Sequence, residues 1–166
     1  FTVTLKHRIA DESYYVKNND ENPETCSEIL EGKNILLAED NDLNAEIAEV
    51  ILERAGLKIE RVEDGIQCVN RIMKMPAGTY DMILMDLVFM DVQMPIMNGY
   101  EAATAIRSLP KHKGELLPIV AMTANAFEED KRKAIEAGMN DHIAKPIQVD
   151  KLLLTLKTIL TENIIL

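Results

Sequence analysis

The amino-acid sequence predicts an α/β fold in which a parallel sheet is covered by helices on both faces. Short, continuously apolar runs, typical of strands buried on both faces, alternate with longer segments in which apolar residues recur at helical spacing. The alternation repeats five times. Strands joined by right-handed crossovers lie parallel, and ligands of such folds bind outside the carboxyl ends of the strands. We therefore expect the functional residues just after each strand.

The first two strands and two helices alternate along the chain. NILLA (34–38) is a short apolar run and predicts a buried strand. Residues 44–55 have helical spacing, and Gly56 is positioned to end that helix. LKIERV (57–62) alternates like a strand, and residues 65–75 are again helical in period.

The remaining elements follow the same rule. Acidic residues stand in the first turn of the helix expected at 127–138, where they suit the helix macrodipole. The other expected elements are a strand within 80–91, a helix at 98–109, the strands PIVAMT (118–123) and DHIA (141–144), and a helix at 149–160.

Three segments lie outside this pattern. Residues 10–32 hold seven acidic residues and one basic residue, and we interpret them as a linker. Residues 1–9 alternate like a strand that has no partner nearby in the sequence, and residues 161–166 form a tail. The chain begins at Phe1 instead of Met, so we expect it to be a piece of a longer protein.

Composition excludes several classes of function. The net charge of −10 argues against the basic surface that a nucleic-acid-binding protein needs. No apolar run is long enough to span a bilayer, and no secretory signal is present. Cys26 and Cys68 match no metal or disulfide spacing, so reduced thiols in a cytosolic setting are expected.

Polar residues of complementary chemistry follow four of the five predicted strands. Glu39 and Asp40 follow the first strand, an aspartate the third, Thr123 the fourth and Lys145 the fifth. Clustered carboxylates repel each other unless a hard cation lies between them, and Mg²⁺ binds one or two carboxylates together with phosphate and water. An aspartate beside Mg²⁺ and a lysine is a nucleophile toward phosphorus. Each residue alone would be an ordinary loop or surface residue, but the ordered set predicts phosphoryl transfer.

The third strand contains a repeat that offers two candidate nucleophiles. DMILM (81–85) is followed by DLVFM (86–90), and Asp91 begins a third segment. Asp86 follows the first apolar run and Asp91 follows the second, so each stands directly after a segment that suits a buried strand. Five residues of extended strand span about 16 Å, so only one of the two lies at a metal site.

Four ordered segments carry a resemblance to a known family: ILLAEDNDLN, MDVQMPIMNGYEA, IVAMTANA and DHIAKPI. They resemble the signature segments of response-regulator receiver domains, in particular those attached to hybrid histidine kinases, over residues 33–160. The resemblance implies a flavodoxin-like doubly wound (βα)5 fold, with a five-stranded parallel sheet in the order 2-1-3-4-5.

The resemblance also implies roles for the residues at the strand ends. Asp40 would be a direct ligand of Mg²⁺, with Mn²⁺ as a substitute, and Glu39 would act largely through water. Thr123 would be the switch hydroxyl, and Lys145 would pair with the phosphoryl group. His142 would occupy the position of the switch ring.

Asp91 is the favoured acceptor, and Asp86 is the alternative. In the family the backbone carbonyl two residues beyond the acceptor binds Mg²⁺, and a Met-Pro turn follows at a fixed offset. Asp91 keeps both features, through Gln93 and Pro95, whereas Asp86 would place apolar LVFM beside the metal. The turn positions implied by the same template are Pro95, Gly99 and Pro146, the last in a cis peptide bond with Lys145.

Two positions depart from the family pattern. Glu39 replaces the commoner aspartate but keeps the charge. Asn98 stands where the family often has an aspartate before glycine, and a tight turn before a helix is an alternative interpretation of Asn98-Gly99.

The resemblance implies partners as well. FTVTLKHR, within residues 1–9, looks like the last strand of a histidine kinase ATP-binding domain. The expected partners are therefore a histidine kinase core in the same polypeptide and a histidine phosphotransfer protein, either docking on residues 44–55.

The fragment lacks a kinase catalytic core and would catalyse only its own phosphorylation and dephosphorylation, while the parent is expected to be a histidine kinase. A homodimer is left open, and no nucleic-acid partner or membrane insertion of the fragment is expected. The expected location is cytoplasmic, with a membrane anchor elsewhere in the parent left open.

Two other functions compete with this interpretation. A receiver-like interaction module that is no longer phosphorylated would use the same fold, but intact Asp40, Thr123 and Lys145 argue against it. A Mg²⁺-dependent phosphohydrolase would place its nucleophile after the first strand. The sequence Asp40-Asn41-Asp42 fits that pattern only superficially, and no substrate-capping insertion is visible.

Overall fold

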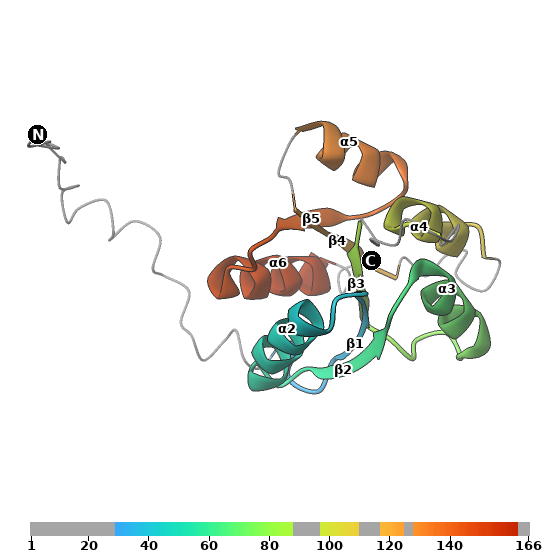
Figure 1. Cartoon of the computed structure of the whole chain (residues 1–166). Helices are drawn as coiled ribbons and strands as arrows, with labels where there is room; N and C mark the ends of the chain where they lie inside the picture. The colour runs from blue at the N-terminus through green and yellow to red at the C-terminus, as the bar shows by residue number, and fades with distance from the viewer. Residues whose placement is uncertain (1–28, 88–96, 110–116, 125–127, 163–166) are drawn as a thin grey trace, which may run out of the picture.

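The computed structural model describes residues 29–87, 97–109, 117–124 and 128–162, and it contains the predicted sheet (Figure 1). Five parallel strands lie in the order β2-β1-β3-β4-β5. The flavodoxin-like strand order is therefore confirmed. The strands are β1 (Asn34–Ala38), β2 (Lys58–Val62), β3 (Met82–Asp86), β4 (Ile119–Thr123) and β5 (Asp141–Ala144).

In the described part of the chain, a helix connects each strand to the next, as the crossover rule requires. These helices are α2 (Asp42–Arg54), α3 (Gly65–Lys74), α4 (Gly99–Arg107) and α5 (Glu128–Glu136), and α6 (Val149–Glu162) follows β5. Helix α2 begins after Asn41, whose side chain accepts a hydrogen bond from the backbone N–H of Asn44, and Gly56 follows its end with a φ of 86°. Asn98 and Glu101 form a capping box at the start of α4, so the asparagine there begins a helix.

Helices cover both faces of the sheet (Figure 1). Alternate strand residues point to opposite faces. Ile35 and Leu37 of β1 pack in a core with α2 and α6. Leu36 and Ala38 pack in a second core with α3 and α4. Because β1, β3 and β4 are buried on both sides, each contains four successive apolar residues instead of alternating.

The packed domain includes residues that precede β1. Leu30, which lies within the segment expected to be a linker, is only 1% exposed and packs in the core with α2 and α6. Residues 1–28 lie outside the described part of the chain. The linker and the strand expected at 1–9 therefore stay predictions.

Cys68 is buried in α3, where it contacts the core with α4. Burial raises the pKa of its thiol to about 12, with the nearby Asp64 carboxylate adding to the effect. The thiolate is therefore scarce at neutral pH. Cys26 lies outside the described residues.

Gly99, the first residue of α4, lies against the carboxyl end of β3. A Cβ atom at this position would collide with the carbonyl oxygen of Asp86 and lie 3.0 Å from the Cα of Leu87. Because these neighbours are backbone atoms, we expect Gly99→Ala to lower the free energy of unfolding by about 1–3 kcal/mol. Urea denaturation followed by circular dichroism measures this. A change within about 0.5 kcal/mol, as for a surface substitution, would contradict the close packing.

Candidate metal and phosphoryl site

The carboxyl end of β1 carries two acidic residues on the loop that leads into α2. The backbone N–H of Glu39 donates to the carbonyl of Val62 at 3.1 Å, which extends the pairing of β1 with β2 by one residue. The Glu39 side chain is buried and accepts hydrogen bonds from Asn41 N (3.3 Å) and Asn44 Nδ2 (3.2 Å). Asp40 is more exposed than Glu39. The loop therefore buries one carboxylate among protein groups and leaves the next residue accessible to solvent.

Asp86 is the last residue of β3, and it is 6% exposed. The start of the same strand is anchored by Asp81. One oxygen of Asp81 accepts from Lys33 Nζ at 3.0 Å, and the other accepts from the backbone N–H of Asn34 at 2.8 Å. The three aspartates spaced five apart thus have different places: Asp81 anchors the strand, Asp86 stands at its carboxyl end, and Asp91 lies outside the described residues.

Lys145 connects the two acidic strand ends. Its Nζ lies 2.6 Å from Glu39 Oε2 and 2.9 Å from Asp86 Oδ2. Burial alone would lower the pKa of Lys145, but the hydrogen bonds to Glu39 and Asp86 outweigh burial and raise it. The lysine is therefore an ammonium ion at neutral pH. The Lys145–Pro146 peptide bond is cis, as expected.

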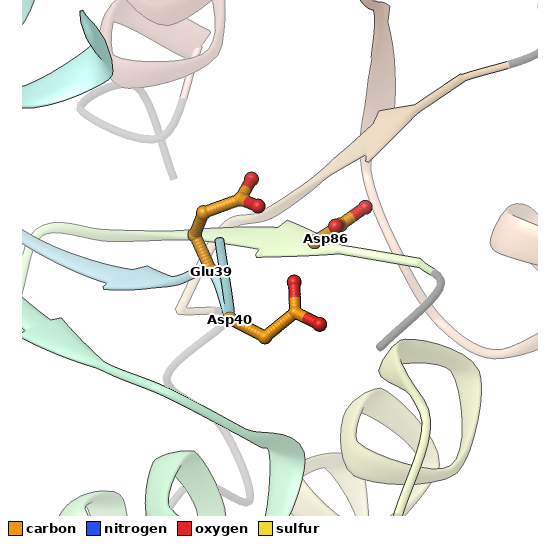
Figure 2. A group of neighbouring side chains, drawn as sticks. All are labelled: Glu39, Asp40 and Asp86. Atoms are coloured by element: carbon orange, nitrogen blue, oxygen red, sulfur yellow. The ribbon is translucent and has the colours of Figure 1, made fainter. Parts of the chain in front are cut away.

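Three carboxylates gather at this edge of the sheet. Figure 2 shows Glu39, Asp40 and Asp86 beside one another at the ends of β1 and β3. Each offers an oxygen, and these oxygens all lie within 4.8 Å of one another. Lys145 offsets one of the three negative charges, so the cluster stays net negative.

This donor set fits a magnesium ion, which binds oxygen ligands and typically one or two carboxylates. Both oxygens of Glu39 are engaged, one by Lys145 and the other by Asn41 and Asn44. Lys145 also pairs with Asp86, at Oδ2. The direct role expected for Asp40 and the indirect role expected for Glu39 stay predictions.

The expected switch residues lie on the two neighbouring strands. Thr123 ends β4, is 4% exposed, and accepts a hydrogen bond through its carbonyl oxygen from the backbone N–H of Lys145 at 2.7 Å. His142 lies on β5, paired with Ala121 of β4. Its Nδ1 lies 3.4 Å from Asp141 Oδ1, without the geometry of a hydrogen bond. The backbone thus holds Thr123 and Lys145 next to each other, with His142 three residues before the lysine.

Asp91, the acceptor favoured from the sequence, lies outside the described residues, as do Gln93 and Pro95. Asp86, the alternative, lies within the carboxylate cluster. The objection to Asp86 is that the apolar LVFM would then follow the acceptor. Leu87, the first of these residues, is 2% exposed and packs in the core, so the objection is weaker than the sequence suggests.

Two residues of the site, Arg61 and Asn44, are not singled out by the sequence. Asn44 holds the Glu39 carboxylate, and Arg61 donates to the loop that carries Glu39 and Asp40. Arg61 is one position in an alternating strand, and alternation does not show where a long side chain ends. The signal lies in the pairing of the strands, because Arg61 stands opposite Leu37, next to the end of β1.

The family model of the response regulator receiver domain matches residues 35–157. The chain belongs to this family. Among curated relatives, this receiver domain is 38% identical over 113 residues to hybrid signal transduction histidine kinase I of Dictyostelium discoideum. It is 39% identical over 114 residues to the sensor histidine kinase GacS of Pseudomonas protegens. Each match covers 68% of this chain, but only 6% and 12% of the respective relatives.

Solved structures of receiver domains have the same fold. One is the receiver domain of the sensor histidine kinase PA1611 from Pseudomonas aeruginosa, described with a magnesium ion coordinated in the active-site cleft. It is 37% identical, with a TM-score of 0.66, over 78% of this chain and 98% of that one. Another is the receiver domain of Saccharomyces cerevisiae Ssk1 in a co-crystal with the histidine phosphotransfer protein Ypd1. It is 32% identical, with a TM-score of 0.63, over 74% of this chain and 84% of that one.

Among the described residues of the receiver domain, no helix has the length and apolar character needed to cross a membrane.

Proposed function

We propose that this receiver domain accepts a phosphoryl group from a phosphohistidine, with Asp86 as the acceptor. The observation that supports this most strongly is the place of the Asp86 carboxylate, 2.9 Å from the Lys145 ammonium and within the cluster with Glu39 and Asp40. A carboxylate oxygen of Asp86 attacks phosphorus and forms the new P–O bond. The P–N bond to the donor imidazole breaks, and the imidazole leaves in its neutral form with the proton held on its other nitrogen.

The surrounding residues offset the charge of the transferring group. Asp40 and Asp86 would hold Mg²⁺, with Glu39 behind them, and the bound ion supplies positive charge to the phosphoryl oxygens. Mn²⁺ has similar ligand preferences and is proposed as a substitute. Lys145 exchanges part of its pairing with Asp86 for a phosphoryl oxygen, because the phosphoryl group carries more negative charge than the carboxylate.

The proposed switch runs from β3 to β5. The Thr123 hydroxyl binds a phosphoryl oxygen, and His142 moves with it. A local gain of negative charge at Asp86 thereby favours one of two arrangements of the surface around β4, α5 and β5.

Helix α2 is the proposed docking surface for the phosphodonor. Leu43, Ile47 and Val50 on this helix are 64%, 46% and 42% exposed, and their spacing of four and three residues places them on one face of it. A groove beside the helix reaches the site, and it is lined by Asn44, Ile47, Lys145, Pro146 and Ile147. A histidine phosphotransfer protein is the proposed occupant, supported by the complex of the Ssk1 receiver domain with Ypd1. A histidine kinase core in the same polypeptide and a cytoplasmic location are proposed with it, since curated relatives are hybrid histidine kinases.

Acetyl phosphate labelling followed by intact mass measurement tests the function. The protein is expected to gain one phosphoryl group in the presence of Mg²⁺ or Mn²⁺. It is expected to gain none in EDTA, because the metal offsets charge in the transition state. A folded protein that binds Mg²⁺ and yet gains nothing, from acetyl phosphate or from a phosphorylated histidine phosphotransfer protein, would favour a non-phosphorylated interaction module instead.

A further inference from the structure

Arg61 of β2 reaches across the end of β1 to the loop that carries the acidic pair. Its Nε donates to the carbonyl oxygen of Glu39 at 3.1 Å, and its Nη2 lies 3.4 Å from the carbonyl oxygen of Asp40. The same Nη2 donates to Asp42 Oδ1 at 2.8 Å. The side chain is 24% exposed, whereas that of Asp42 is 92% exposed. The two carbonyl contacts are therefore the better protected part of this interaction.

The two carbonyl groups belong to the two acidic residues of the site. Fixing a carbonyl oxygen fixes the peptide plane that follows it, and so limits the rotation of the backbone on both sides. The planar guanidinium group presents its N–H donors in a fixed fork, so it constrains both planes at once. The direction of the Asp40 side chain depends on these planes.

We propose that Arg61 is a positioning residue for the metal site: it holds the Glu39–Asp40 loop in the conformation that binds Mg²⁺. The proposal rests on the proposed function, because it concerns the metal of the same site. Arg61 touches backbone oxygens and Asp42, and it acts on the ion through Asp40. Partners that orient metal ligands in this way typically change affinity by about 10–100-fold when they are replaced.

Charge and positioning predict opposite results, which makes the proposal testable. Arg61 carries a positive charge close to a cation site, so removing that charge alone would strengthen Mg²⁺ binding. Removing the constraint on the loop would weaken it. If Arg61 had no influence on the metal site, replacing it would leave the Mg²⁺ affinity unchanged. The direction of the change in affinity therefore separates the three explanations.

Isothermal titration of Mg²⁺ into Arg61→Gln and Arg61→Lys decides between them, since the chain contains no tryptophan to report binding by fluorescence. We expect the dissociation constant to rise on the order of tenfold in Arg61→Gln. Arg61→Lys keeps the charge but loses the planar fork of N–H donors. We expect the dissociation constant of this variant to rise as well, but by less than in Arg61→Gln. Lys58→Gln, at the other end of β2, is the charge-matched control and is expected to match the wild type. Tighter binding in Arg61→Gln, or wild-type affinity in both Arg61 variants, would overturn the proposal.

A second measurement is independent of the metal. Hydrogen exchange in EDTA reports on the amides of Asn41, Asn44 and Ala45, which are hydrogen bonded within this loop and its cap. They are expected to exchange faster in Arg61→Gln than in the wild type, with amides of β4 unchanged. Unchanged exchange in the loop would overturn the positioning role. A wild type that binds no Mg²⁺, together with faster exchange in the variant, would instead contradict the proposed function and leave the role of Arg61 in ordering the loop supported.

Discussion

Asp86→Asn is expected to reduce labelling by acetyl phosphate to background, because the amide that replaces the carboxylate is a poor nucleophile toward phosphorus. The substitution keeps the shape of the side chain, and it removes negative charge from a cluster of three carboxylates, two of which pair with Lys145. We therefore expect the variant to fold. Intact mass measurement after incubation with Mg²⁺ and acetyl phosphate gives the labelled fraction directly.

The repeat supplies matched controls for this variant. Asp81→Asn and Asp91→Asn carry the same chemical change five residues away on either side, and both are expected to be labelled like the wild type. Circular dichroism checks that each variant is folded. Labelling that persists in Asp86→Asn and disappears in Asp91→Asn would show that the sequence-based preference for Asp91 is correct.

Replacing Lys145 with methionine is expected to have the largest effect on stability. Lys145 is the cation between Glu39 and Asp86, whose side chains are 1% and 9% exposed. Removing one partner of a buried ion pair typically costs about 3–5 kcal/mol, since the remaining charge is left uncompensated. Because the lysine side chain keeps 18% exposure, we expect the lower end of that range in EDTA. Urea denaturation measures the loss, and added Mg²⁺ is expected to recover part of it.

A double variant separates charge from packing. Glu39→Gln in the Lys145→Met background removes one of the unpaired carboxylates, so the double variant is expected to be more stable than Lys145→Met alone. Equal or lower stability of the double variant would contradict the view that charge in the cluster dominates the effect.

The loss of stability caused by Lys145→Met is expected to depend on pH in a defined direction. The pKa of Lys145 is raised in the folded protein, since its hydrogen bonds to Glu39 and Asp86 outweigh the effect of burial. A raised lysine pKa contributes stability that is fully present below the unfolded value of about 10.4 and is lost as the pH rises through the folded value. The difference between wild type and Lys145→Met should therefore be constant around neutral pH and shrink as the pH rises into the strongly alkaline range.

The fold could be predicted from the sequence because local and global signals agree in most elements. The last four residues of NILLA are apolar because β1 is buried on both faces, and β3 and β4 repeat that pattern. Gly56 and Asn98 mark helix boundaries for reasons of backbone geometry and capping that act within a few residues. The strand ends then bring Glu39, Asp40 and Lys145 together without further information.

The register of β3 could not be predicted in this way. Both copies of the repeat, DMILM and DLVFM, have an aspartate followed by four apolar residues, so either suits a buried strand. The choice depends on contacts from distant parts of the chain. Asp81 pairs with Lys33 and with the backbone of Asn34, which places Asp86 at the other end of the strand. Arg61 could not be predicted for a similar reason, since it reaches across a strand pair and two of its three acceptors are backbone carbonyl oxygens.

Locating the phosphoryl group on the phosphorylated wild-type protein tests the central claim most directly. Borohydride reduces an aspartyl phosphate to homoserine, and tryptic digestion places Asp81, Asp86 and Asp91 in one peptide, which ends at Arg107. Fragmentation of this peptide by mass spectrometry then reads which aspartate was converted. Homoserine at position 86 is the predicted result. Homoserine at position 91, with aspartate intact at 86, would contradict it.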